Sequence, residues 1–277
     1  MKPAPFDYVK ARSVADACMS LADGGTDTAA IAGGQSLLPM LSLRVALPEV
    51  VVDLGGLDEL KEVSATADTV RIGALTTHAT IEDGKLPDAF GGMMQRVASK
   101  ISYRAVRNYG TIGGSVALAD PAADWPGCLM ALRAKVRISG NKGARSELLE
   151  DFVHGQYATS LAPGEIILGF DIPRPDRAMR WGVFKVVRKS GAFAQSIAFA
   201  VEQGKGGPVS VVLAAAAATP RALPGVANAI MSGKSSEAQL RAAITVDIAK
   251  HAPQQDPYLM RLHTSTVLRA VLEMKSR

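Results

Sequence analysis

Apolar and polar residues change their spacing several times along the first two thirds of the chain, and each spacing predicts a different element. After Ser13, apolar residues recur at the spacing of one helix face, and Asp16 serves as the capping partner of Ser13. Short apolar runs bounded by turn residues predict strands at 28–31, 50–52, 69–74 and 166–172. The remaining segments predict helices at 88–100 and 124–133, and a hairpin from residue 135 around a turn at 140–143.

The last third of the chain has a different pattern, with longer strands followed by helices. Strands are expected at about 181–188, 194–202 and 209–217, and the glycine-rich segment 204–207 connects the second to the third. Two helices then close the chain, one from Ser236 and one from Asp256. Because strands and helices are mixed without strict alternation, the pattern favours an α+β fold.

Size and charge narrow the classes of protein to be considered. The 277 residues, 48% of them hydrophobic, are enough for one large domain or two closely packed ones, and the polar segment 174–177 is the expected boundary. The net charge of +5 is spread over both signs without an arginine-rich stripe, which indicates an ordinary protein surface and argues against nucleic acid as a partner.

The number of cysteines limits the cofactors that this sequence can bind, and the apolar runs indicate where the protein is located. Cys18 and Cys128 are the only two cysteines, so this sequence cannot supply the four thiolates of an iron–sulfur cluster. The N-terminal residues have no apolar segment typical of a signal peptide, and no apolar run reaches 18 residues. We therefore expect a cytoplasmic protein without a membrane span. The four histidines show no metal-ligand spacing, and no residue is assigned as catalytic or as a metal ligand.

Two glycine pairs are the strongest chemical signals in the sequence. One lies in the segment 32–36, Ala-Gly-Gly-Gln-Ser, and the other in the segment 111–115, Thr-Ile-Gly-Gly-Ser. Glycine allows a close backbone approach, and successive amide N–H groups in such a loop can bind an anion, with nearby hydroxyls as further donors. Two such loops that face each other could hold a diphosphate. Taken alone, each pair is more often just a turn than a phosphate site, and neither matches the Rossmann or P-loop pattern.

Longer strings around these pairs resemble a known family. Residues 30–60, AIAGGQSLLPMLSLRVALPEVVVDLGGLDEL, are similar to the first FAD-binding segment of the medium subunits of the xanthine dehydrogenase and carbon monoxide dehydrogenase family. Further similar strings are IGALTTHATI at 72–81, VRNYGTIGGSVALADPAADWP at 106–126, GEIILGFDIP at 164–173 and FKVVRKSGAFA at 184–194. The resemblance extends over essentially the whole chain.

The resemblance implies a fold and a set of domains. It implies an FAD-binding domain of the vanillyl-alcohol oxidase (PCMH) type at 1–175, with subdomains at about 1–55 and 56–175. A smaller α+β domain of the carbon monoxide dehydrogenase flavoprotein type would follow at 176–277, with a three-stranded antiparallel sheet and helices.

The resemblance also implies which residues contact FAD. The first diphosphate loop is matched by Ala30, Ile31, Ala32, Gly33, Gly34, Gln35, Ser36 and Leu37, and the second by Thr111, Gly113, Gly114 and Ser115. Asp124 matches an aspartate on the sugar-alcohol part of FAD, Ile167 a backbone contact, and Lys185 a lysine near the flavin. Ile101 and Phe193 complete the implied set.

Several of these positions have a plainer interpretation from the residues alone. Asp124 could be a helix N-cap, Lys185 an exposed strand lysine and Phe193 a core residue. The chain also departs from many relatives, with Leu118 in place of a polar residue and Phe193 in place of Tyr or Trp. His78 lies in the similar string 72–81, where a structural role is the simpler interpretation.

The implied function is electron transfer within a molybdenum hydroxylase. In that family a large subunit carries the molybdenum–pterin site, a small subunit carries two [2Fe–2S] clusters, and FAD in the medium subunit passes the electrons to an external acceptor. The resemblance therefore implies partner polypeptides in a dimer of heterotrimers, a heterohexamer. Two alternatives stay open: a free-standing flavin reductase of the same fold, and a scaffold subunit without FAD. The substrate and the acceptor are not determined.

Overall fold

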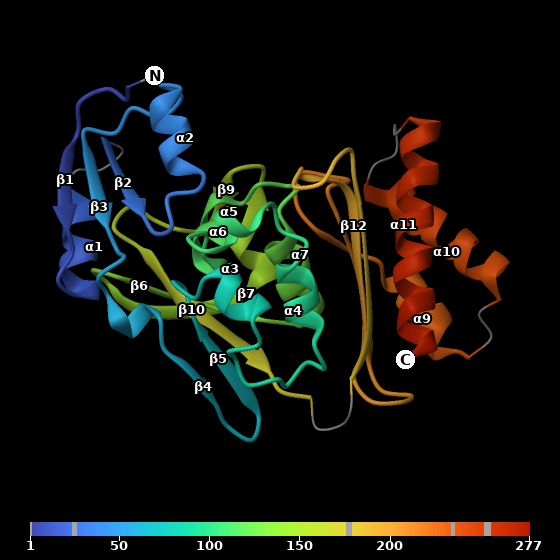
Figure 1. Cartoon of the computed structure of the whole chain (residues 1–277). Coiled ribbons are helices and arrows are strands. Elements are labelled where there is room, and N and C mark those ends of the chain that lie inside the picture. Colours follow the sequence, from blue (N-terminus) through green and yellow to red (C-terminus); the bar gives the residue numbers. More distant parts are fainter. Residues whose placement is uncertain (1, 24–26, 176–178, 234–235, 252–255) are drawn as a thin grey trace.

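The computed structural model describes residues 2–23, 27–175, 179–233, 236–251 and 256–277. Three units follow one another along the molecule, with the N-terminal unit at one end and the C-terminal helices at the other (Figure 1). The middle unit lies between them. Its position brings segments from both ends of the sequence together around it.

The N-terminal unit is a small parallel sheet with strand order β1-β3-β2. Its elements are β1 (Asp7–Lys10), α1 (Val14–Asp23), β2 (Thr28–Ile31), α2 (Leu37–Ser42) and β3 (Val50–Asp53). The two strands expected in this part are confirmed. One of the two hydrogen bonds of the predicted capping box of α1 is confirmed, since Asp16 N donates to Ser13 Oγ at 3.1 Å. In place of the other, the Asp16 carboxylate accepts from Arg12 N. The helices follow strands in alternation here, unlike the rest of the chain.

The middle unit is a five-stranded antiparallel sheet, order β4-β5-β10-β6-β7, with short helices packed on it. Its strands are β4 (Val63–Ala65), β5 (Thr69–Gly73), β6 (Lys135–Gly140), β7 (Gly143–Leu148) and β10 (Ile166–Pro173), with the separate pair β8 (Val153–Gly155) and β9 (Ala158–Thr159). Its helices are η2 (Asp58–Leu60), α3 (His78–Glu82), α4 (Met93–Ala98), α5 (Arg104–Arg107), α6 (Ile112–Leu118), α7 (Asp124–Ala131) and α8 (Leu149–Phe152). The expected hairpin at 135–148 is confirmed.

Two expectations for the middle unit were wrong in detail. The helix expected at 88–100 is shorter, because Gly91 and Gly92 have left-handed φ values of 55° and 78° and α4 begins only after them. The segment 107–115 is not a loop throughout. Thr111 caps α6 by accepting from Gly114 N at 3.1 Å, so both glycines of the second pair lie in the first turn of a helix.

The C-terminal unit is an antiparallel sheet, order β11-β12-β13-β14. Its elements are β11 (Arg180–Val187), β12 (Ala194–Glu202), β13 (Val209–Ala214), β14 (Arg221–Ala222), α9 (Pro224–Met231), α10 (Glu237–His251) and α11 (Pro257–Ser276). The three expected strands and the two closing helices are confirmed. The expected three-stranded sheet is corrected to four strands by the two-residue β14, and α9 was not expected.

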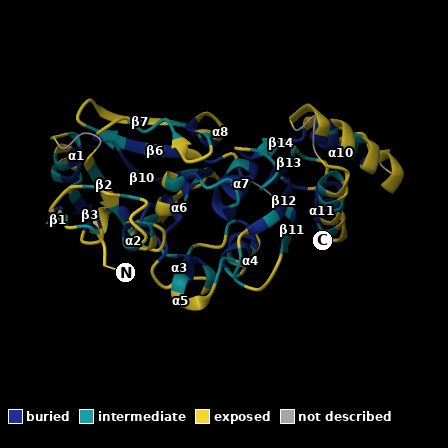
Figure 2. Cartoon of the chain, turned by 90° about the horizontal axis from the view of Figure 1, so that it is seen from above, coloured by how far each residue is buried: buried dark blue, intermediate teal, exposed yellow. Residues whose placement is uncertain are grey.

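Both faces of the C-terminal sheet are buried, which explains why β12 is apolar almost throughout. Ile197, Phe199 and Val201 point into the core shared with the middle unit, while Ala198 and Ala200 pack under the C-terminal helices. Viewed from above, the buried strands lie between α7 on one side and α11 on the other (Figure 2). The middle unit and the C-terminal sheet therefore share one continuous core.

The connection between β10 and β11 contains residues 176–178, so the expected domain boundary at 175/176 lies at the edge of the described residues. No helix in the described part of the chain combines the length and the apolarity that a membrane crossing requires.

The contact of β11 with α11 depends on a glycine. A Cβ atom at Gly182 would lie 2.0 Å from the carbonyl oxygen of Ala270 and 2.6 Å from the amide nitrogen of Met274, both in the backbone of α11.

We expect Gly182→Ala to lower the free energy of unfolding by about 2–3 kcal/mol, because the helix must move off the sheet. Urea unfolding measures this. Gly155→Ala is the control, since its Cβ would meet only Ala158 Cβ at 3.8 Å. Equal effects of the two substitutions would contradict the explanation.

Candidate functional site

A cavity of about 540 Å³ opens where the three units meet. Its volume is typical of a small-molecule site. Its wall includes the turn between β2 and α2, the start of α6 and the start of α7. The hairpin between β11 and β12 completes it. The structure therefore brings together segments more than 150 positions apart in the sequence, such as Gly34 and Phe193.

Nearly all the residues selected from the sequence line this cavity. They are Ala30, Ala32, Gly33, Gly34, Gln35, Ser36, Leu37, Ile101, Thr111, Gly113, Gly114, Ser115, Asp124, Ile167, Lys185 and Phe193. Ile31 is the exception and belongs to β2 behind the wall. The wall also contains Leu118, His78 and the carboxylates of Asp120 and Glu165, which had not been selected. Both of these carboxylates have protein partners, Tyr157 for Asp120 and Arg145 for Glu165.

The first glycine loop offers a run of unused amide donors. Gly34 has a left-handed φ of 70°, and α2 begins directly after it with the bond from Leu38 N to Gly34 O at 3.0 Å. Within the described part of the chain, the amides of residues 33–36 have no acceptor, and the Ser36 side chain does not cap α2. Adjacent free N–H groups at the start of a helix favour an anion.

The second glycine loop is built differently. Its amides are already used: Ile112 N donates to Thr76 O, Gly113 N to Ala74 O and Gly114 N to Thr111 Oγ1, at 3.0, 2.9 and 3.1 Å. The expectation that this loop offers an amide cradle is therefore wrong. What it presents to the cavity is space at the exposed Gly114 and a hydroxyl at Ser115, for which the described residues provide no partner.

The two loops touch through Gly33. A Cβ atom at Gly33 would lie 1.9 Å from the carbonyl oxygen of Tyr109 and 3.0 Å from Gly110 Cα. Only glycine permits this approach, so the free amides of the first loop are held against the second loop. The simple-turn interpretation does not account for a contact between two turns that are distant in sequence.

A buried ion pair forms another part of the wall. Lys185 Nζ lies 2.8 Å from Asp124 Oδ2 and also donates to Lys100 O at 3.0 Å. The side chains of Asp124 and Lys185 are only 5% and 8% exposed. Burial raises the pKa of Asp124 to about 6, although the charge of Lys185 opposes this shift. The second carboxylate oxygen, Asp124 Oδ1, is buried without a partner in the described structure.

The plainer interpretations of these residues are wrong. Ala123, rather than Asp124, takes the N-cap position of α7, and Lys185 is buried rather than exposed. Phe193 is 61% exposed at the mouth of the cavity, so it is not a core residue.

The hairpin that carries Phe193 is fixed by an aromatic contact. Tyr103 donates from its hydroxyl to Ser190 O at 2.9 Å. Gly191 has a left-handed φ of 78°, and a Cβ there would lie 2.5 Å from Cζ of the Tyr103 ring. The ring of Tyr103 therefore packs directly on the backbone of this hairpin, beside the cavity.

The residues present fit FAD. The acceptor-free amides of residues 33–36 suit its diphosphate, and the unpartnered Asp124 Oδ1 suits a hydroxyl of its sugar-alcohol chain. The apolar side chains of Leu37, Met40 and Ile101 suit its ring systems.

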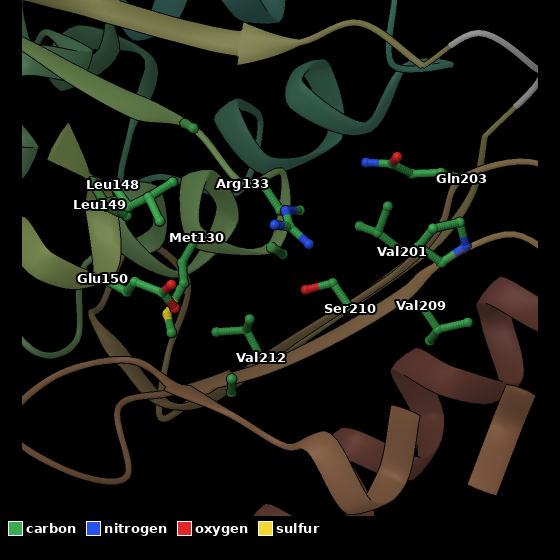
Figure 3. A pocket seen from close by; sticks show the side chains of 14 residues that line it. Met130, Arg133, Leu148, Leu149, Glu150, Val201, Gln203, Val209, Ser210 and Val212 are labelled. Atoms are coloured by element: carbon green, nitrogen blue, oxygen red, sulfur yellow. The ribbon is translucent and has the colours of Figure 1, made fainter. Parts of the chain in front are cut away.

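A second cavity, of about 220 Å³, lies between the end of α7 and the strands β12 and β13 (Figure 3). Arg133, Gln203 and Ser210 face it. None of the residues selected from the sequence line this cavity.

Comparisons with known proteins agree with the geometry. Residues 4–175 match the family described as the FAD binding domain in molybdopterin dehydrogenase. The carbon monoxide dehydrogenase medium chain of Afipia carboxidovorans is 32% identical, over 100% of this chain and 99% of that protein. The 6-hydroxypseudooxynicotine dehydrogenase complex subunit alpha of Paenarthrobacter nicotinovorans is 38% identical, over 74% of this chain and 71% of that protein.

A solved structure extends the likeness to the whole fold. The carbon monoxide dehydrogenase from Hydrogenophaga pseudoflava, in a form that lacks the Mo-pyranopterin moiety of its molybdenum cofactor, superposes with a TM-score of 0.94 at 29% identity. The superposition covers 100% of this chain and 99% of that one.

The buried ion pair leads to a stability prediction. We expect Lys185→Met to lower the free energy of unfolding at pH 8 by about 3–5 kcal/mol, because it leaves the Asp124 carboxylate buried without a counter-charge. At pH 5 the loss should be smaller, since the pKa of Asp124 is about 6 and the protonated group needs no partner. Urea unfolding of the wild type and the variant at pH 8 and pH 5 measures the loss of unfolding free energy at each pH.

Arg241→Met is the matched control, because it removes an ion pair to Glu237 whose side chains are 48% and 58% exposed. That pair should contribute less than about 1 kcal/mol. If Lys185→Met costs no more than Arg241→Met at pH 8, the Asp124–Lys185 pair does not act as a buried unit.

Proposed function

The chain belongs to the family of FAD-binding medium subunits of molybdenum hydroxylases, and from that premise we propose the part that each group of its residues plays. It is an oxidoreductase subunit with an FAD-binding domain followed by a smaller C-terminal domain of sheet and helices. We propose that it takes electrons from [2Fe–2S] clusters of a partner subunit to FAD and on to an external acceptor. The convergence of the free amides at 33–36, Asp124 and Lys185 on one cavity carries this proposal.

The two loops contact the diphosphate in different ways in this proposal. The amides of residues 33–36 donate to the phosphate oxygens, and the hydroxyls of Ser36 and Ser115 add donors. Gly114 keeps a side chain out of the space that the phosphates need, and Gly33 lets the first loop lie against the backbone at Tyr109. Asp124 accepts from a hydroxyl of the sugar-alcohol chain through Oδ1. Bound FAD supplies the electron-carrying chemistry of the subunit.

Lys185 sets the electrostatics on the flavin side of the cavity. Two of its three ammonium protons go to Asp124 and Lys100, which leaves one donor. Because Asp124 compensates its charge, Lys185 acts on the cofactor by a directed hydrogen bond within a nearly neutral pair. Such a donor stabilises negative charge that develops on the flavin. Phe193, at the mouth of the cavity, would cover one flavin face, and Ile101 and Ile167, which line the wall, would contact the cofactor.

The remaining redox centres belong to partner polypeptides in this proposal. Both cysteines, Cys18 and Cys128, are buried and unpaired, and the described residues contain no cluster of side chains that could hold a metal ion. We therefore propose a large molybdenum–pterin subunit and a small [2Fe–2S] subunit as partners, in a dimer of heterotrimers. The organic substrate is bound by the large subunit. The unpaired thiols support a cytoplasmic location.

We also propose that the domain boundary lies at 175/176. The last strand of the middle unit ends at Pro173 and the first strand of the C-terminal sheet begins at Arg180. Within the first domain, the parallel sheet at 7–53 forms the first subdomain and the antiparallel sheet the second.

The diphosphate assignment predicts the effect of filling the second loop. Gly114→Leu should lower the FAD content of the purified chain at least about tenfold, because its side chain extends into the space of the charged phosphates and breaks hydrogen bonds to them. Gly114→Ala is the matched control. It introduces the same Cβ, which would lie 2.9 Å from Thr111 Oγ1, but does not reach into the cavity.

The ratio of flavin to protein absorbance measures the retained FAD, and circular dichroism checks the fold. Full flavin content in a folded Gly114→Leu protein would show that the loop does not hold the diphosphate. A wild-type chain that carries no flavin, even with FAD added, would instead point to a scaffold subunit.

The electron path predicts which step depends on Lys185. In the purified complex, an Asp124→Asn/Lys185→Met double variant should reduce its flavin about tenfold more slowly than Asp124→Asn alone, because one donor to developing negative charge is lost. Reduction of the iron–sulfur clusters by substrate should keep its normal rate in both. Rapid mixing with substrate, followed at cluster and flavin wavelengths, separates the two steps.

Slower cluster reduction in the double variant would contradict this division of labour. Direct reduction of the FAD by substrate in the isolated chain would contradict it too, and would favour a free-standing flavin reductase.

A further inference from the structure

We propose that His78 is a cofactor-contacting residue whose uncharged imidazole donates a hydrogen bond from Nε2 to an acceptor oxygen of the bound FAD. This inference rests on the proposed FAD site. It adds a donor that neither the glycine loops nor the Asp124–Lys185 pair provides.

The protein fixes which nitrogen of His78 carries the proton. Trp125 Nε1 lies 3.0 Å from His78 Nδ1, and both side chains are buried. An indole N–H can only donate, so Nδ1 must be the acceptor and the proton of the neutral ring must reside on Nε2. Trp125 follows Asp124 in the first turn of α7, which links His78 to the ion pair across the cavity wall.

The protonated nitrogen has no use within the protein. His78 is 5% exposed and lines the same cavity as the two glycine loops. Within the described ranges, Nε2 has no acceptor, whereas Nδ1 has Trp125. Nε2 is not one of the fully buried side-chain atoms without a partner, so this nitrogen is open to the cavity that His78 lines. A donor in that position gains a hydrogen bond when a bound molecule offers an acceptor. The cavity is where an acceptor can reach it.

The backbone around His78 holds the ring in place against the second loop. His78 N donates to Gly110 O at 2.9 Å, and Thr77 forms a bridge with Thr111. A Cβ atom at Gly110 would lie 2.8 Å from His78 Nε2, so any larger residue there would displace the ring. Gly110 lines the cavity as well, which places the Nε2 side of the ring beside the loop that ends in Thr111.

The surroundings keep this histidine uncharged. Burial lowers the pKa of His78 to about 4, and the charge of Arg107 lowers it further. Arg107 is itself bound to Glu82 through two hydrogen bonds of 2.8 and 2.9 Å. At neutral pH the ring is therefore a donor that adds no net charge, so the effect on FAD is that of a single directed bond.

Three substitutions separate a role toward FAD from a role in packing. His78→Gln places an amide N–H near the position of Nε2 but gives Trp125 no acceptor. His78→Asn places an amide oxygen near the position of Nδ1, for Trp125, but does not reach the cavity. His78→Leu does neither. Titration of FAD into the full-length chain, after removal of bound flavin, gives the dissociation constant of each variant.

We expect His78→Leu and His78→Asn to raise the FAD dissociation constant about tenfold, and His78→Gln to raise it no more than about threefold, because only Gln keeps a donor to the cavity. If the ring served only to hold Trp125, Asn would bind FAD best and Gln as poorly as Leu. That order, or equal affinities in all three variants, would overturn the proposal.

Nuclear magnetic resonance on the wild-type chain with ¹⁵N-labelled histidine is independent of any variant's folding. The Nε2–H resonance of His78 should move when FAD binds, and it should not titrate between pH 8 and pH 6. An unchanged resonance in flavin-loaded protein would overturn the proposal. Failure of the wild-type chain to bind FAD would instead overturn the proposed function.

The same samples identify the acceptor oxygen. If it belongs to the diphosphate, the ³¹P resonances of bound FAD differ between wild type and His78→Leu while the flavin absorption band stays unchanged. If it is a flavin carbonyl, the absorption band shifts and the ³¹P resonances stay.

Discussion

The buried ion pair between Asp124 and Lys185 is the interaction on which the cavity depends. It joins the first residue of α7 in the middle unit to β11 in the C-terminal unit. Two buried charges are stable only when their geometry is held, so α7 and β11 must keep a fixed distance. The packing of Gly127 on α7 against Phe199 of β12 provides this, since a Cβ at Gly127 would lie 2.5 Å from the Phe199 ring.

A second close contact brings the N-terminal part of the chain to the cavity wall. Gly33 meets the backbone at Tyr109, which places the unused amides of the first loop opposite the start of α6. The amides of the second loop already donate hydrogen bonds to Thr76 O, Ala74 O and the capping hydroxyl of Thr111. The two glycine pairs look alike in sequence, yet the first loop leaves its amides unused and the second uses its amides within the protein and leaves open space at Gly114.

The charged and hydrogen-bonding groups of the cavity wall support the proposal that the cavity holds a redox cofactor. Its titratable groups are paired or kept neutral: Asp124 with Lys185, and His78 with Trp125. Such groups fix charge and direction around a cofactor. This agrees with the proposal that electrons pass from clusters of a partner subunit to FAD on this chain and on to an external acceptor.

The sequence by itself determined most of the elements and most of the residues that line the large cavity. Strand and helix patterns depend on neighbours a few residues apart, and the strings around Gly33, Gly113, Asp124 and Lys185 were specific enough to identify the family. Only the tertiary structure decided which groups meet. Asp124 and Lys185 are 61 positions apart, and Trp125 and His78 are 47 apart. Local patterns carry no information on such pairs, because burial and hydrogen bonding between distant segments arise when the units pack together.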